Sequence, residues 1–217
     1  MRSDNNRADT PQIAVATVDA KAYYALSSLL NEMKLSFESF SPDNDIDPNI
    51  QLILTTHKER RLIKSRKVLC LEDIAGIDTV AKEKIFSRLF SSGEDMLLIG
   101  IDPGDRTGII SFYRGIEILD RVTLSLDKTL STLTDLIKNS QAKQKIVRIG
   151  DGDPGKANYI AGYLLEKFKE MIEIEIVNEK GTSKMANPIH FKGPKDLRSA
   201  RIISLRRGQR YQGDSFR

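Results

Sequence analysis

Acidic side chains follow several apolar segments in the second half of the chain, at the points where those segments end. Asp102 comes directly after the apolar run MLLIGI, and Asp151 comes directly after KIVRIG. Glu179 ends the alternating segment EIEIVNE. The carboxyl ends of parallel strands meet at one edge of a sheet, where ligands bind, and neighbouring strands lie about 4.8 Å apart. The pattern therefore predicts carboxylates that converge at one sheet edge.

Two further acids complete the candidate set. Asp153 lies in the turn GDGDP and competes with Asp151 as a ligand, and Asp196 opens the last expected helix. Converged carboxylates repel one another and are costly to desolvate unless a divalent cation neutralises them. Oxygen ligands suit Mg²⁺ or Mn²⁺. Two such ions, about 3.5–4 Å apart, clamp the attacking and leaving oxygens of a phosphodiester, so we expect two-metal hydrolysis.

Each acid taken singly has an ordinary structural alternative. Asp102 precedes the turn-forming pair Pro103-Gly104, and Asp196 stands where an acid stabilises a helix N-terminus. The coincidence of several acids at matching strand ends favours function over this alternative. The glycines at 100, 104 and 108 are interpreted as positions where a nucleic-acid backbone approaches closely.

A second unit, residues 95–217, must position these acids. Hydrophobic periodicity predicts a strand at 96–102, two strands in 107–125, a helix at 126–141, a strand at 145–151, a helix at 156–172, a strand at 173–179 and a helix at 195–208. Arg114-Gly115 is typical of a two-residue hairpin turn, and Gly208 is expected to follow the last helix as its C′ residue. The segment 180–194 is a breaker-rich loop and a candidate flap over the site. Three antiparallel strands followed by alternating helices and strands predict an α/β domain.

The first unit, residues 13–92, is expected to be a smaller α/β domain. Strands are predicted at 13–18, 35–40, 50–56 and 67–74, and helices at 20–34 and 78–90. Asp19 and Asp78 are the expected helix caps, and the alternation favours a mostly parallel, doubly wound sheet. Residues 1–12 are interpreted as a disordered tail. With Gly76 as its single glycine, this unit carries no phosphate-binding fingerprint, so a partner-binding or DNA-positioning role is the modest inference.

Charge favours a polyanionic partner. The 217-residue chain has a net charge of +4 and a pI of about 9.1. From residue 184 to the end there are nine Lys and Arg against two acids. The candidate phosphate contacts are Lys184, Lys192, Lys195, Arg198, Arg201, Arg206 and Arg207. The one cysteine excludes an internal disulfide, and the two histidines are too far apart in sequence for a Cys/His zinc pattern. No apolar run is long enough for a bilayer and no signal peptide is evident, so we expect a cytoplasmic location without membrane contact.

Four motifs in the second unit carry a resemblance to a known family. These motifs are IGIDPGDRTGI (99–109), VRIGDGDP (147–154), VNEKGTS (177–183) and KDLRSARIIS (195–204). Over about 120 residues the chain resembles the RNase H-like superfamily, in its branch of RuvC-type Holliday junction resolvases and YqgF-type (RuvX) nucleases. The resemblance implies a mixed five-stranded sheet of order 3-2-1-4-5. It also implies a metal-dependent endonuclease that acts on DNA junctions ahead of RNA, with a possible homodimer.

The resemblance also assigns roles to the acids. It makes Asp102 the first-strand metal ligand, Asp151 the fourth-strand acid, Glu179 the fifth-strand acid and Asp196 the acid of the last helix. The pattern departs from the family at Ser199, where a second helix acid often stands, and in the additional N-terminal unit.

Three alternatives follow. One is a non-catalytic nucleic-acid-binding module with a degenerate site, and another is an RNA-processing YqgF-like nuclease. The third is an ATP-dependent kinase or ATPase of the actin and sugar-kinase type, whose opening strand and hairpin resemble GIDPGDRTG. Against the third, DGDPGK lacks the phosphate-loop spacing, and the second unit is too short for a two-lobed cleft.

Overall fold

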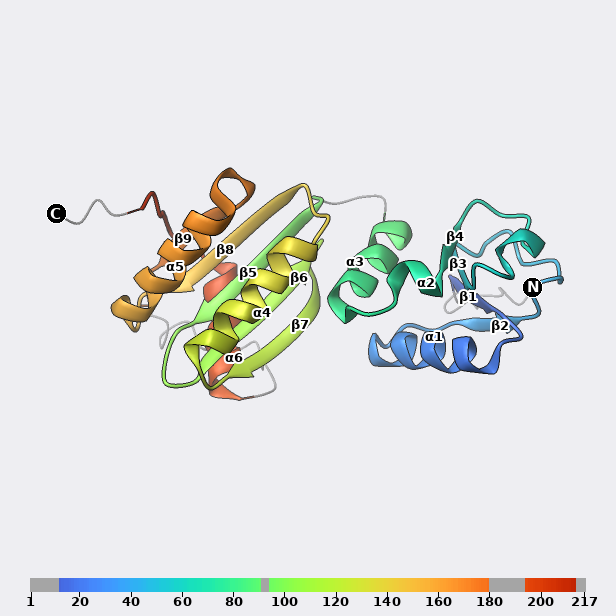
Figure 1. The fold of residues 1–217 in the computed structure, drawn as a ribbon, viewed down its shortest axis with the longest axis horizontal. Helices are drawn as coiled ribbons and strands as arrows, with labels where there is room; N and C mark the ends of the chain where they lie inside the picture. Colours follow the sequence, from blue (N-terminus) through green and yellow to red (C-terminus); the bar gives the residue numbers. More distant parts are fainter. Residues whose placement is uncertain (1–11, 91–93, 180–193, 214–217) are drawn as a thin grey trace, which may run out of the picture. The chain divides into compact units, whose positions relative to one another are not determined.

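The chain divides into two compact units, Met1–Ser92 and Gly93–Arg217, and each has an α/β fold (Figure 1). A computed structural model describes residues 12–90, 94–179 and 194–213. The expected tail falls almost entirely outside these ranges, as does nearly all of the candidate flap. No helix within the described ranges combines the length and the apolar character needed to cross a membrane.

The first unit is built on a small parallel sheet. Its strands are β1 (Ile13–Ala16), β2 (Glu38–Phe40), β3 (Leu52–Thr55) and β4 (Val68–Cys70), in the order β2-β1-β3-β4. Its helices are α1 (Ala20–Glu32), α2 (Leu71–Ile74) and α3 (Asp78–Leu89), with a 3₁₀ turn at Arg60–Leu62. The predicted strand at 67–74 is therefore too long, because the chain turns into α2 directly after Cys70.

The helices of the first unit pack on one face of its sheet, which corrects the expected doubly wound arrangement. Leu26 and Leu30 of α1 and Ile85 of α3 join the apolar cluster of that face. The opposite face is covered by connecting segments through Ile50 and Ile63. Asp19 caps α1 as predicted, whereas Ile77 is the N-cap residue of α3 and the predicted cap, Asp78, lies in the first turn.

The second unit is built on a mixed six-stranded sheet. The strands are β5 (Met96–Asp102), β6 (Thr107–Tyr113), β7 (Ile116–Thr123), β8 (Gln144–Gly150), β9 (Glu173–Val177) and β10 (Gln209–Arg210), in the order β10-β9-β8-β5-β6-β7. Strands β5 to β9 follow the expected order 3-2-1-4-5. The sixth strand, β10, was not predicted; Gly208 leads into it instead of closing the last helix. A Cβ at Gly208 would lie 2.3 Å from the Ile176 carbonyl oxygen, so only glycine permits this approach to β9.

Three helices enclose this second sheet. In Figure 1, α4 (Leu126–Asn139) and α5 (Pro154–Phe168) lie in front of the sheet, and α6 (Lys195–Leu205) lies behind it. A 3₁₀ turn at Lys169–Met171 follows α5. Helix α6 packs mainly on β5, with further contacts to β6 and β8. The central strand β5 supplies fully buried side chains to the core, among them Leu97, Ile99 and Ile101.

Glycines of β5 and β6 allow α6 to lie directly on the sheet. A Cβ at Gly100 would stand 2.3 Å from the Ala200 carbonyl oxygen, and one at Gly108 would stand 2.2 Å from the Asp196 carbonyl oxygen. Both distances are shorter than any van der Waals contact, so any side chain would push the helix away. The expectation that these glycines receive a nucleic-acid backbone is therefore wrong for Gly100 and Gly108, because the chain's own helix occupies that space.

Candidate metal centre at the edge of the second sheet

Strand register brings the predicted acids to one edge of the second sheet. Ile101 of β5 pairs with Ile149 of β8, and Gly150 of β8 pairs with Val177 of β9. Asp102 is the last residue of β5, while Asp151 and Glu179 follow β8 and β9 by one and two residues. Three neighbouring strands therefore deliver an acid to the same end of the sheet.

Glu179 folds back over the end of β8 because Gly150 has no side chain. A Cβ at Gly150 would lie 2.0 Å from Glu179 Oε1, and the amide of Gly152 donates a hydrogen bond of 3.1 Å to the same oxygen. Asp151 fixes the backbone at this point, since its Oδ1 accepts a 2.9 Å hydrogen bond from the Glu179 amide. The turn GDGDP thus holds the Glu179 carboxylate in place.

Asp102 is half-buried at the centre of the site, and its proton affinity is abnormal. Burial, followed by repulsion from Glu179 and Asp196, raises its pKa from 3.8 to about 6. A hydrogen bond from Ser199 and the charge of Lys195 act in the opposite direction but do not cancel the rise. The carboxyl groups of Glu179 and Asp196 are therefore close enough for their charges to act on Asp102.

Asp196 reaches the site from the first turn of α6 and is already paired. Its Oδ2 lies 3.1 Å from Nε of Arg106, a residue of the turn after β5. About a quarter of the Asp196 side chain is exposed, and more than half of the Arg106 side chain. Arg106 therefore offsets part of the negative charge of the site.

Asp153, the rival of Asp151, serves a different purpose. Its side chain caps α5 by accepting a 3.1 Å hydrogen bond from the Lys156 amide, and it forms an ion pair of 3.3 Å with Lys156 Nζ. Backbone capping and the Lys156 charge lower its pKa. Both acids of the GDGDP turn are thus engaged, but Asp151 is the one linked to Glu179.

The carboxylates suit a hard divalent cation, although they are not drawn tightly together. Among the described residues, the acids of the second unit include no three with ligand oxygens all within 4.8 Å of one another. Oxygen donors that repel one another, with Asp102 raised to a pKa of about 6, are the donor set that Mg²⁺ or Mn²⁺ stabilises. Asp102, Glu179 and Asp196 would hold such an ion, and the side chains would have to close around it.

The predicted phosphate contacts have unequal surroundings. Lys184 and Lys192 fall outside the described residues. Lys195, Arg198 and Arg207 are exposed on or just after α6. Arg201, by contrast, is largely buried in a two-bond ion pair with Glu117 of β7, and Arg206 donates a 3.3 Å hydrogen bond to the Asn178 carbonyl. Arg201 is therefore the least suited of the set to meet a phosphate.

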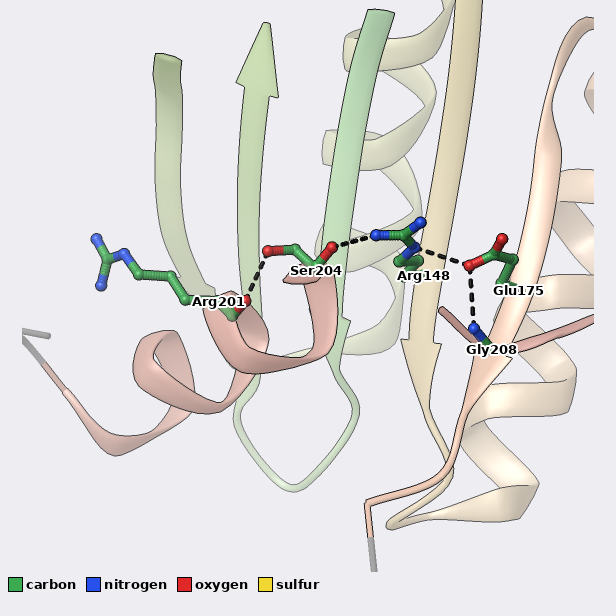
Figure 2. A network of polar contacts seen from close by, with 5 residues as sticks. All are labelled: Arg148, Glu175, Arg201, Ser204 and Gly208. Carbon is green, nitrogen blue, oxygen red and sulfur yellow. Dashed lines mark hydrogen bonds and ion pairs between the residues drawn. The ribbon is translucent and has the colours of Figure 1, made fainter. Parts of the chain in front are cut away.

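A buried polar network that sequence reasoning missed fixes the other end of α6 (Figure 2). Arg148 of β8 forms a 2.7 Å ion pair with Glu175 of β9 and donates a 2.5 Å hydrogen bond to the Ser204 carbonyl oxygen at the end of α6. Glu175 also accepts a hydrogen bond from the Gly208 amide. The signal in the sequence is the single arginine inside the apolar run KIVRIG, since a charge in a buried strand requires a partner.

Sequence reasoning also missed a group in the first unit. His57, Cys70 and Asp73 each place one ligand atom within 4.8 Å of the others, and no other described group of three or more His, Cys, Asp or Glu does so. Residues that are far apart in the sequence therefore lie close together here, although the sequence carries no Cys/His spacing pattern. The strand-end rule applied to the acids would have found this group, because His57 follows β3 and Cys70 ends β4.

Comparison with known proteins adds no assignment to this geometry. No protein-family model matches the chain, and no curated protein matches its sequence.

Proposed function

We propose that the second unit is a metal-dependent endonuclease that acts on structured nucleic acid, with junction DNA ahead of RNA. The observation that carries this proposal is Asp102, a half-buried carboxyl at the end of the central strand whose pKa is raised to about 6 by burial, Glu179 and Asp196. Groups with strongly shifted pKa values concentrate at functional sites. The resemblance of the four motifs to RuvC-type and YqgF-type nucleases supports the same reaction.

The residues of the site divide into ligands and positioning groups. Asp102, Glu179 and Asp196 are the proposed cation ligands, and Asp151 positions Glu179 through the amide hydrogen bond of 2.9 Å. Bound Mg²⁺ or Mn²⁺ would lower the pKa of a water nucleophile and stabilise the leaving oxygen. Arg106 forms an ion pair with Asp196, with which a bound cation would compete, and Ser199 donates a hydrogen bond to Asp102.

The exposed basic side chains of α6 and the segment after it supply the proposed substrate contact. Lys195, Arg198 and Arg207 lie on the element that also carries Asp196, or directly after it. Phosphate contacts of this kind make binding weaken steeply as salt concentration rises. The net charge of +4 also favours binding to a polyanion.

Cleavage of labelled substrates tests the proposal. Four-way DNA junctions and structured RNA are incubated with the full chain and Mg²⁺ or Mn²⁺, and the Asp102→Asn variant is compared with the wild type. The matched control is Asp135→Asn, which removes an exposed acid of α4 on the opposite face of the sheet. We expect cleavage by the wild type and the control and none by Asp102→Asn. Equal products from wild type and Asp102→Asn, or none from the wild type with either ion, would refute it.

A non-catalytic nucleic-acid-binding module is the second candidate, and one observation favours it. Ser199 stands where the resolvases often carry a second helix acid, and its hydroxyl is a poorer metal ligand than a carboxylate. Calorimetric titration with Mn²⁺ separates the two functions. A nuclease requires Mn²⁺ binding that Asp102→Asn weakens, whereas a binding module needs only salt-sensitive affinity for nucleic acid.

A further inference from the structure

The carboxyl edge of the first sheet gathers three side chains that the proposed nuclease does not use. His57 lies two residues after β3, Cys70 is the last residue of β4, and Asp73 belongs to the short helix that follows. Strands β3 and β4 are neighbours, with Thr55 paired to Cys70. One ligand atom from each of His57, Cys70 and Asp73 lies within 4.8 Å of the other two.

Two acids hold His57 in place, one at its imidazole ring and one at its backbone amide. His57 Nε2 lies 3.0 Å from Asp73 Oδ1, and the His57 amide donates a 3.0 Å hydrogen bond to Glu72 Oε2. Both the backbone and the ring of His57 are thus anchored to α2. Such anchoring reduces the ordering cost of assembling a binding site.

The group is also open to ions from the solvent. The His57 side chain is 56% exposed and that of Asp73 48% exposed, whereas Cys70 is buried beneath them. Because two of the three ligands are about half exposed, a cation from the solvent reaches the group through the His57 and Asp73 side chains. With bond lengths of about 2.0–2.3 Å, tetrahedral ligand atoms stand roughly 3.3–3.6 Å apart. The ligand atoms of this group already lie within 4.8 Å of one another, so small side-chain movements complete the site.

The mixture of donors indicates the kind of ion. One thiol, one imidazole and one carboxylate are the ligands that Zn²⁺ combines, in contrast to the oxygen-only set that suits Mg²⁺. Three protein ligands leave a fourth tetrahedral position for water.

We propose that His57, Cys70 and Asp73 form a zinc site at the carboxyl edge of the first sheet, with Glu72 as a positioning residue. The proposal is independent of the nuclease function, because it concerns the other unit and a different class of metal. The ligands come from two neighbouring strand ends and the helix after them. Zinc therefore ties the end of β3 to the start of α2.

Cobalt replacement provides a direct test, because a thiolate bound to Co²⁺ gives a charge-transfer absorption band. Cys70 is the only cysteine in the chain, so any such band reports on this site alone. Titration of the full chain with Co²⁺ is expected to saturate at one equivalent, and one equivalent of Zn²⁺ is expected to remove the band. A large excess of Mg²⁺ should leave the band unchanged.

Variants distinguish a built site from a thiol that collects cobalt by itself. Cys70→Ser should abolish the band, and Glu72→Gln should weaken cobalt affinity about tenfold. His57→Gln and Asp73→Asn should weaken cobalt affinity at least as much. Both side chains are about half exposed, so these substitutions should leave the fold intact. The control Asp45→Asn removes an exposed acid elsewhere in the same unit and should change nothing. Absence of a band in the wild type would overturn the proposal, as would unchanged affinity in both His57→Gln and Asp73→Asn.

Discussion

One buried or half-buried acid lies near the carboxyl edge of each sheet, Glu59 in the first unit and Asp102 in the second. The surrounding groups shift their pKa values in opposite directions. In the first unit, buried Glu59 accepts hydrogen bonds from Thr17 Oγ1 at 2.5 Å, the Val18 amide at 2.8 Å and Thr56 Oγ1 at 2.7 Å. Burial acts to raise its pKa, but these three donors outweigh burial and lower it. In the second unit, burial and neighbouring acids raise the pKa of Asp102 to about 6.

The difference shows that an acid at a strand end is not by itself a site. Glu59 has a structural role, since its donors join the ends of β1 and β3 and leave its charge satisfied. At Asp102, within the part of the chain that the structure describes, a hydrogen bond from Ser199 lowers the pKa, but burial and the charges of Glu179 and Asp196 outweigh it. What distinguishes a candidate ligand from a structural acid is therefore the number of donors that face it, which the sequence does not display.

The largest expected effect comes from removing the support of α6. Arg148→Leu leaves Glu175 buried without its cation, and loss of one partner of a buried pair costs about 3–5 kcal/mol. Urea unfolding should show the loss in the transition of the second unit, with that of the first unit unchanged. Arg198→Ala, an exposed change on the same helix, should stay within about 0.5 kcal/mol. Equal stability of Arg148→Leu and wild type would contradict the role of the network.

Gly100→Ala should act nearly as strongly, because the new Cβ would lie 2.3 Å from the Ala200 carbonyl oxygen. Overpacking of this kind costs about 1–3 kcal/mol, and displacement of α6 should also weaken Mn²⁺ binding through Asp196. Thermal unfolding and calorimetry measure the two consequences. Gly155→Ala is the matched control, since its nearest neighbouring atom would be 3.6 Å away. A Gly100→Ala protein that unfolds like the control would mean that α6 does not lie on this strand.

Neutralising the two contrasted carboxylates should change stability in opposite directions at pH 7 without metal. Glu59→Gln replaces one of the two acceptor oxygens with an NH₂ donor, so at least one of the three donors loses its acceptor. The change should destabilise the first unit by about 1–3 kcal/mol. Asp102→Asn relieves repulsion and should stabilise the second unit by about 1 kcal/mol, a figure reduced for the partial solvent screening of this half-buried group. Urea unfolding measures both changes. If the two substitutions change the free energy of unfolding in the same direction, the proposed difference between Glu59 and Asp102 is wrong.

The same contrast predicts opposite pH dependence. The stabilisation associated with Asp102 is fully present below its ordinary pKa of 3.8 and is lost as the pH rises through about 6. Glu59 has a lowered pKa, so its contribution is present above its ordinary value of 4.5 and is lost as the pH falls through the folded-state pKa. Denaturation curves from pH 3 to 8 measure both, and in Asp102→Asn and Glu59→Gln the corresponding dependence should disappear. If the pH dependence of stability is the same in a variant as in the wild type, that dependence comes from other titrating groups.

The smallest expected effect concerns Arg106. Its ion pair with Asp196 is partly exposed and contributes about 1 kcal/mol or less to stability. Arg106→Gln should release Asp196 and strengthen Mn²⁺ binding a few-fold in calorimetry, with little change in the unfolding midpoint. Weaker Mn²⁺ binding in this variant would show that Arg106 holds Asp196 in a useful position rather than competing with the cation.

The sequence predicted the second sheet well because its signals are local. The run MLLIGID is continuous and apolar, and Arg114 and Gly115 both adopt the positive φ that a two-residue hairpin turn requires, 52° and 79°. Strand β10 was missed because two exposed residues carry no periodic pattern. The helix faces of the first unit could not be predicted either, since alternation of helices and strands does not say which face each helix covers.

The sequence indicated which acids lie at the candidate site, but not which hydrogen bonds and charges surround each of them. Strand-end reasoning named Asp102 and Glu179, and the start of the last expected helix supplied Asp196; the charges of Glu179 and Asp196 act on Asp102. It did not separate Asp151, which positions Glu179, from Asp153, which caps α5. That distinction depends on which backbone amide each side chain faces, and such contacts arise only when distant segments meet.

Helix α6 follows strands β5 to β9 in the sequence, so a ribosome releases these five strands before the helix that covers them. Until α6 docks, the face of the sheet at Gly100 and Gly108 is exposed to water. Asp102 is also hydrated at that stage, and Asp196 is not yet beside it. Docking of α6 adds the repulsion from Asp196 to that from Glu179, which follows β9 and precedes the helix in the chain. The site therefore acquires its full set of repelling carboxylates, and its strongest reason to bind a divalent ion, only once α6 lies on the sheet.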